Sequence, residues 1–209
     1  MKTFFIIIAG VFCMMANAQD TITNTIPYQR ILIEAGVHIP FGKLADKIGA
    51  GPEFGIWYRS RMLNNDFIDV GISLYIPGNR RGFDYQDEGS NYKVKPAEVS
   101  GMVGVRMNKP YRLGDVNSKK TLEWSTTGGY AFFMYNDKKV RSGNGSTRND
   151  VVGNTKALST FQIGQGIKFT NNNLGIQLNY NYTPYGLLSR HVPDNFGSHS
   201  FTISVFYKL

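Results

Sequence analysis

Residues 174–183 read LGIQLNYNYT. Apolar and aromatic side chains occupy the even positions from Leu174 to Tyr182, and polar side chains occupy the odd positions from Gln177 to Thr183. Successive side chains of a β-strand point to opposite faces, so strict alternation predicts a strand with one apolar and one polar face. The apolar face of this strand must contact either a protein core or a membrane, and the polar face must contact water or other polar groups.

Seven other segments repeat this two-residue period. The eight predicted strands cover residues 30–39, 53–59, 68–76, 98–107, 122–134, 160–169, 174–183 and 200–209. Most of them exceed the roughly 5–6 residues that are usual for strands in soluble sheets. Their length suits tilted strands that cross a bilayer. An even number of such strands predicts an antiparallel up-and-down barrel.

Short and long connections alternate along the chain. Residues 63–66 (LNND) and 170–173 (TNNN) have tight-turn composition, whereas 41–50, 78–92, 136–154 and 184–197 form longer links. If the first strand starts on the periplasmic side, all four long links lie outside the cell, which is typical of outer-membrane barrels. The link at 108–119 is an exception, because it falls on the periplasmic side and is longer than expected.

The two faces of the strands differ in polarity. Aromatic residues gather near the ends of the apolar faces, with Phe54, Phe161, Tyr182 and Phe201 toward one rim and Trp124, Phe169 and Tyr207 toward the other. Such girdles are typical of transmembrane barrels. The polar faces are expected to line the lumen and carry five acidic and five basic residues: Arg30, Glu34, Glu53, Arg59, Asp69, Glu98, Arg106, Glu123, Lys168 and Lys208.

The N-terminus indicates export. Lys2 precedes an apolar stretch from Phe4 to Ala16, and Ala16-Asn17-Ala18 provides small residues for cleavage before Gln19. This layout predicts a cleaved signal peptide over residues 1–18 and a barrel domain over residues 19–209. The single cysteine, Cys13, lies inside the leader. Bulky Phe12 precedes it, which argues against a lipoprotein signal.

Alternation by itself does not distinguish a membrane barrel from a secreted sandwich or a lipocalin-like barrel. The leader, the strand lengths and the asymmetry of the connections favour an all-β, eight-stranded transmembrane barrel in a bacterial outer membrane. The composition agrees, with 23 Gly, 14 Phe and 12 Tyr in 209 residues and 18% charged residues. The mean hydropathy of −0.25 averages two faces of opposite character.

Two segments then carry a resemblance to a known family. They are AGVHIPFGK at residues 35–43 and the glycine-rich GAGPEFG at residues 49–55. With these segments and its alternating last strand, the chain resembles the PorT-like family of small bacterial outer-membrane β-barrel proteins. The resemblance implies a barrel fold and an outer-membrane location, with some members of such families tied to protein secretion or cell-surface integrity.

The last strand also looks like a signal for the barrel-assembly machinery, which is the expected partner for insertion. Such signals usually end on an aromatic residue, whereas this chain ends Tyr207-Lys208-Leu209. Other envelope proteins are further candidate partners.

An eight-stranded barrel is only wide enough for its own side chains. The ten lumen charges therefore predict a paired polar plug, because buried charges require partners. The alternative is a narrow, porin-like pore or carrier for small solutes.

The net charge of +8 raises the question of an anionic partner. The link at 136–154 contains Lys138, Lys139, Arg141 and Arg148, which we expect on the external side, near lipopolysaccharide phosphates. The alternative interpretation is that the positive charge suits the anionic membrane surface in general and forms no specific binding site. No basic-aromatic motif indicates nucleic-acid binding.

The sequence predicts no cofactor. A lipid A hydrolase would need a His-x-Ser pair, but His199 and Ser200 are adjacent and point to opposite faces. The external residues His191, Asp194 and His199 lack metal-ligand spacing. The acidic residues Asp84, Asp87 and Glu88 do not match a calcium loop. We therefore expect no catalytic or metal site.

Overall fold

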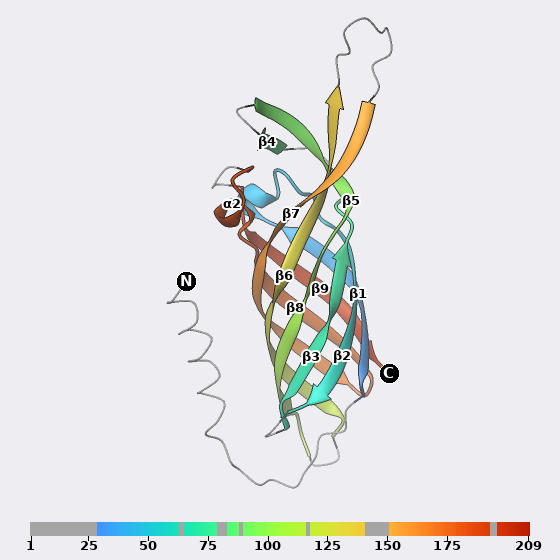
Figure 1. Cartoon of the computed structure of the whole chain (residues 1–209). Helices are drawn as coiled ribbons and strands as arrows, with labels where there is room; N and C mark the ends of the chain where they lie inside the picture. The colour runs from blue at the N-terminus through green and yellow to red at the C-terminus, as the bar shows by residue number, and fades with distance from the viewer. Residues whose placement is uncertain are drawn as a thin grey trace, which may run out of the picture.

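The computed structural model describes residues 29–62, 65–78, 83–87, 90–115, 118–140, 151–192 and 196–209 (Figure 1). Strands account for most of them. The nine strands are β1 (Ile31–Pro40), β2 (Gly51–Arg61), β3 (Phe67–Tyr75), β4 (Phe83–Asp87), β5 (Ser90–Arg112), β6 (Lys120–Val140), β7 (Val151–Asn171), β8 (Leu174–Tyr182) and β9 (His199–Lys208). The 3-10 turn η1 (Gly42–Leu44) and the short helix α2 (Tyr185–Leu188) lie in connections. Neither described helix is long and apolar enough to cross a bilayer.

Eight of the strands close into a barrel. Each pairs antiparallel with its neighbours in the chain, except that β3 pairs directly with β5 and leaves β4 outside the wall. The last strand returns to the first, with Leu32 opposite Lys208 and Pro40 opposite Ser200. The predicted fold is therefore confirmed: an all-β, eight-stranded, antiparallel up-and-down barrel.

The two faces lie as the alternation predicts. In β8, the side chains of Leu174, Ile176 and Leu178 are exposed on the outer wall, whereas Gln177 and Asn179 are buried inside. The same pattern holds for β9, where Ile203 is 53% exposed and Thr202 is 2% exposed. Polar residues therefore fill most of the barrel, together with a buried apolar group of Leu32, Trp57, Met102 and Phe206, and apolar residues cover the outside.

Three strands extend further than the sequence predicted. The link expected at 136–154 shortens to 141–150, because β6 and β7 remain paired up to Val140 opposite Val151. Similarly, the link expected at 108–119 shortens to 113–119. In the upper extensions the alternation is lost, because strands paired beyond the barrel wall need no apolar outer face. Figure 1 shows β5, β6 and β7 continuing above the barrel mouth.

The link expected at 78–92 contains a further strand. β4 pairs with the upper part of β5 from Phe83 opposite Val94 to Asp87 opposite Ser90. This hairpin lies above the wall (Figure 1). Its inward side chains, Phe83 and Tyr85, are only 2% and 4% exposed. The hairpin was missed because five residues with one apolar face are too few to distinguish from a loop.

An apolar cluster covers the upper mouth of the barrel. It combines side chains from the β1–β2 and β8–β9 connections, from β4 and from the upper parts of β3, β5, β6 and β7. Its members are Leu44, Ile48, Tyr75, Phe83, Tyr85, Val94, Phe133, Tyr135, Leu158, Tyr185, Val192 and Phe196. We call this group the apolar cap. Burial in it raises the pKa of the Tyr185 phenol, which keeps this group neutral.

Glycine allows the two long connections to pack tightly together in the apolar cap. Gly197 has φ +101°, a conformation that glycine adopts without strain. A Cβ atom at this position would also lie 2.3 Å from the backbone nitrogen of Leu44. The β8–β9 connection is thus held directly against the β1–β2 connection.

Candidate functional site: the lumen of the barrel

The lower lumen contains a network of ion pairs, which we call the lower ion network. At its centre, the Arg59 guanidinium donates two hydrogen bonds to Asp69 at 2.7 and 3.0 Å, and two to Glu123 at 2.9 and 3.1 Å. Lys168 Nζ lies 3.1 Å from Asp69 Oδ2, and Lys208 Nζ lies 2.8 Å from Glu123 Oε1. The residues come from β2, β3, β6, β7 and β9, so the network crosses the barrel interior.

A second layer of buried polar groups is built around Trp57. The Arg106 guanidinium carbon lies 3.6 Å from the centre of the Trp57 ring, a cation–π distance, and Arg106 Nη1 donates to Glu34 Oε1 at 2.5 Å. Gln177 Nε2 donates to the other oxygen of Glu34 at 3.0 Å. All four side chains are at most 4% exposed, so each charge has an immediate partner in a dry environment.

A third layer is a chain of hydrogen bonds nearer the apolar cap. His38 Nδ1 lies 3.0 Å from Glu53 Oε2, which also accepts a hydrogen bond from Thr202 Oγ1 at 3.0 Å. Asn181 Nδ2 donates to Thr202 Oγ1 at 3.2 Å. Gln162 Nε2 donates to Asn181 Oδ1, and the side-chain oxygen Oε1 of Gln162 accepts a hydrogen bond from Thr183 Oγ1. This chain joins β1, β2, β7, β8 and β9.

The structure brings together eight of the ten lumen charges named from the sequence. They comprise four carboxylates, Glu34, Glu53, Asp69 and Glu123, and four cations, Arg59, Arg106, Lys168 and Lys208. Their formal charges cancel when His38 is neutral. Arg30 is exposed at the start of β1 and does not join them, and the side chain of Glu98 lies outside the described part of the structure.

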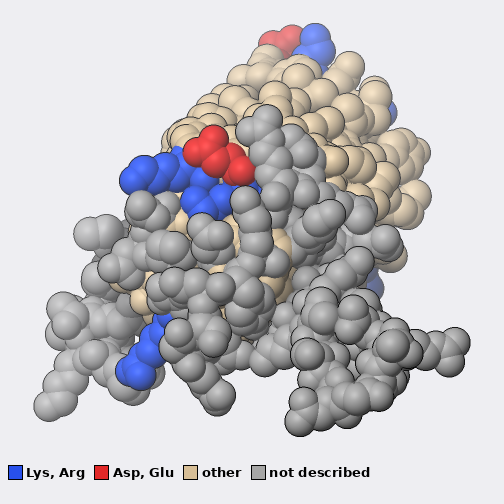
Figure 2. Space-filling view, turned by 90° about the horizontal axis from the view of Figure 1, so that it is seen from above, with Lys and Arg blue, Asp and Glu red and all other residues tan. Residues whose placement is uncertain are grey.

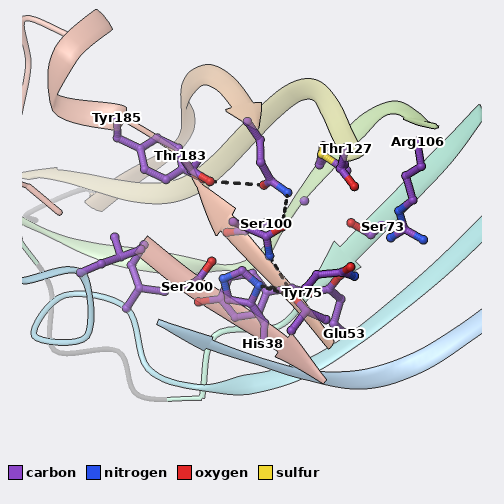
Figure 3. A pocket seen from close by; sticks show the side chains of 18 residues that line it. His38, Glu53, Ser73, Tyr75, Ser100, Arg106, Thr127, Thr183, Tyr185 and Ser200 are labelled. Atoms are coloured by element: carbon purple, nitrogen blue, oxygen red, sulfur yellow. Dashed lines mark hydrogen bonds and ion pairs between the residues drawn. The ribbon is translucent and has the colours of Figure 1, made fainter. Parts of the chain in front are cut away.

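A polar cavity lies between the Arg106 layer and the apolar cap (Figure 3). Its lining is mainly hydroxyl and amide groups, with Leu44, Ile48, Met102 and Tyr185 as apolar exceptions. Figure 3 shows His38, Glu53 and Tyr75 close together on one side, and the ring centres of His38 and Tyr75 lie 4.3 Å apart. The two charged groups of this cavity, Glu53 and Arg106, are already paired within the protein.

Trp57, His38 and Gln177 all face the lumen, but the sequence predicted no role for them. Trp57 is fully buried, and its position among polar neighbours was the only signal that a large aromatic side chain lies inside the barrel. The partners of Glu34 were not visible in the sequence. Gln177 lies 143 residues away from it along the chain, and no local pattern connects them.

The outer wall is apolar over most of its height. Exposed side chains include Phe54, Tyr130, Ile176 and Ile203, each between 53% and 58% exposed. Near the end with the short connections, Trp124 and Tyr207 are each 47% exposed. Figure 2 shows this wall as a mostly uncharged surface, with charged side chains toward its ends. The uncharged polar residues Thr126 and Gln165 lie opposite each other within the wall.

The residues that the sequence predicted on the external side are only partly described. Lys138 and Lys139 belong to β6, but their side chains, together with Arg141 and Arg148, lie outside the described part. The same applies to the side chains of Asp84 and Asp87, and to Glu88 and Asp194. Among the described residues, no group of three His, Cys, Asp or Glu side chains could hold a metal ion.

Two histidines near the end that carries the apolar cap pack against aromatic groups. His191 stacks on Tyr85, with ring centres 4.9 Å apart and planes at 10°. His199 Nδ1 lies 2.6 Å from the Tyr180 hydroxyl, and its ring stacks on Phe41 at 5.6 Å. Ser200 is buried on the opposite face of β9 from His199, so the two do not form a pair for nucleophilic catalysis.

No protein-family model matches the chain, and no curated protein does. Solved structures similar to it include the N-terminal β-barrel domain of OprF from Pseudomonas aeruginosa, with a TM-score of 0.44, 13% identity, and coverage of 87% of this chain and 98% of that chain. Ail, the attachment invasion locus protein of Yersinia pestis, has a TM-score of 0.40 and 14% identity over 88% of this chain and all of Ail. Its complex with the heparin analogue sucrose octasulfate gives a TM-score of 0.43. At these values the similarity concerns the barrel architecture and assigns no function.

Proposed function

We propose that this chain is a non-enzymatic outer-membrane barrel with a structural or interaction role at the bacterial cell envelope. The observation that carries the proposal is the closed barrel whose outer wall is apolar and whose polar groups face inward. A barrel surrounded by water would expose this wall at a large cost, because contiguous apolar surface is normally buried. A bilayer is the environment in which the same wall is stable.

The remaining parts of the proposal follow from the sequence. Residues 1–18 act as a cleaved export signal, and the barrel-assembly machinery inserts residues 19–209. Lys138, Lys139, Arg141 and Arg148 extend toward lipopolysaccharide phosphates on the external side. The PorT-like resemblance favours a task in protein secretion or surface assembly, carried out with envelope proteins as partners.

A pair of arginine substitutions on the wall tests the membrane location. Leu178 lies mid-wall in β8 and Leu209 follows the end of β9. In a bilayer, Leu178→Arg is expected to cost about 2–4 kcal/mol, and Leu209→Arg about 0–1 kcal/mol, because the cost of a charge falls toward the interface. Urea unfolding in phospholipid vesicles measures both values. Equal, small effects of the two substitutions would contradict a lipid-facing wall.

Cell fractionation and gel migration provide a second test of the location. The protein is expected in the outer-membrane fraction, and unboiled samples are expected to migrate differently from boiled ones because the closed barrel resists unfolding. Recovery of the folded protein from the soluble fraction would favour a secreted barrel. Affinity purification of the tagged chain from its own envelope would identify secretion or surface-assembly partners.

A further inference from the structure

We infer that the polar cavity in the upper lumen is a binding chamber for a small, neutral, hydroxyl-bearing solute. This inference goes beyond the envelope role proposed above and does not depend on any protein partner. It rests on the polar lining of the cavity, on its unsatisfied polar atoms and on its size and surroundings.

The first observation is that the cavity presents polar atoms that lack partners. Ser100 Oγ, Asn179 Oδ1 and Arg106 Nε are buried and form no hydrogen bond within the described protein. These three side chains are only 2–4% exposed, and all three line the cavity. Leaving such atoms unsatisfied is costly, so a molecule that supplies donors and acceptors is stabilised there.

The second observation concerns charge. Glu53 is hydrogen-bonded to His38 and Thr202, and Arg106 is paired with Glu34, so both carboxylate and guanidinium of the described lining already have partners. A charged solute would lose its hydration without gaining a counter-charge, which is strongly unfavourable in a buried site. A neutral solute with several hydroxyl groups loses less on entry and finds both donors and acceptors.

The third observation concerns size and surroundings. The space accommodates about three water molecules, so the solute must be small. Apolar side chains of Leu44, Ile48 and Tyr185 form the upper boundary, and the Arg106–Trp57 layer lies below. A triol such as glycerol can replace three waters with its three hydroxyl groups while its carbon atoms contact the apolar side.

Glycerol is therefore the probe for the test. Purified full-length barrel in detergent micelles is titrated with glycerol and followed by saturation-transfer NMR of the glycerol protons. We expect saturable binding with a dissociation constant in the millimolar range, as is usual for a ligand of this size. Ser100→Val removes one hydroxyl from the cavity and is expected to weaken binding about fivefold.

Ser125→Val is the matched control. Ser125 is also buried, faces the lumen and has an unpartnered hydroxyl, but it does not line the cavity. This variant should bind glycerol like the unsubstituted protein. Thr127→Val, which changes a cavity residue with little change in volume, provides a second variant if Ser100→Val fails to fold. Migration on unboiled gels confirms that each variant forms the barrel.

Two results would overturn the inference. Saturation transfer that does not saturate, or that is equal for Ser100→Val, Thr127→Val and Ser125→Val, would show that the cavity holds water alone. Binding of glycerol 3-phosphate as tight as that of glycerol would contradict the requirement for a neutral solute. Both outcomes leave the proposed envelope role unaffected, because that role is tested by location and unfolding.

Discussion

At the scale of single residues, the interior depends on complete pairing of buried charges. Lys168 is fully buried, yet Asp69 lies within 3.1 Å and the Phe206 ring centre within 6.0 Å. Such pairs add little net stability compared with an apolar core, but removing one partner is costly because the other stays buried and charged. The arrangement therefore fixes which strands face one another across the lumen.

Arg59 is the residue whose loss should be most damaging. Arg59→Met keeps an unbranched side chain but removes all four of the hydrogen bonds to Asp69 and Glu123. We expect the free energy of unfolding to fall by about 3–5 kcal/mol, measured by urea denaturation in vesicles. Arg30→Met is the control, since Arg30 is exposed, and it should change stability by no more than about 0.5 kcal/mol. Equal effects of the two substitutions would contradict a structural role for the lower ion network.

At the scale of elements, the seam between β1 and β9 closes the barrel. These strands approach closely at Gly36, where an added Cβ would lie 2.2 Å from the carbonyl oxygen of Ile203 and 2.4 Å from the Ser204 Cβ. Backbone atoms of a paired strand cannot move aside for a methyl group, whereas the end of a flexible side chain can. Glycine is therefore required here by close packing and not by an unusual backbone angle.

This close approach predicts different outcomes for two alanine substitutions. Gly36→Ala should destabilise the barrel by roughly 1–3 kcal/mol and slow its closure, because the seam must open to admit a methyl group. Gly128→Ala in β6 should be tolerated, because a Cβ there meets no described atom within 4 Å. The fraction of folded protein on unboiled gels during refolding into vesicles measures both effects. A fully tolerated Gly36→Ala would show that the seam is looser than its geometry indicates.

The elements also show what the sequence could predict. The period of two placed Ile176 outside and Gln177 inside correctly, because membrane and lumen impose opposite polarities on alternate residues. The turn at Asn172 was also predicted, and its φ of 57° is one that asparagine tolerates. The end of β6 and the start of β7 were not predicted, because the residues there pair above the wall, where no alternation is imposed.

The sequence also could not predict which residues pair with each other inside the lumen. The polar faces of the predicted strands carry equal numbers of acidic and basic residues, and burial of charge predicted that they pair. Which carboxylate meets which cation depends on barrel closure and on the register between strands. Arg59 and Glu123, for example, are 64 residues apart and meet across the interior. The apolar cap was missed for the same reason, since its members come from segments that meet only after the barrel has closed.

At the scale of the whole molecule, two different barriers lie in series along the barrel axis. Below, the lower ion network spans the lumen with side chains that are at most 8% exposed. Above, the apolar cap places buried aromatic side chains such as Phe133 and Phe196 over the mouth. The polar cavity lies between them. A solute that reached this cavity would still have one barrier ahead of it, which favours a closed interior over a pore.

This arrangement predicts how the protein behaves in planar bilayers. Purified barrel should show no discrete conductance steps, because an ion would have to pass both barriers in series. Arg59→Met alone and Phe196→Ala alone should also be silent, since each leaves the other barrier in place. The double variant is the one expected to show brief openings. Fixed-size steps from the unsubstituted protein would overturn the closed interior and favour a narrow pore, whereas steps from Phe196→Ala alone would show that the lower ion network does not block ions and that the apolar cap is the only barrier.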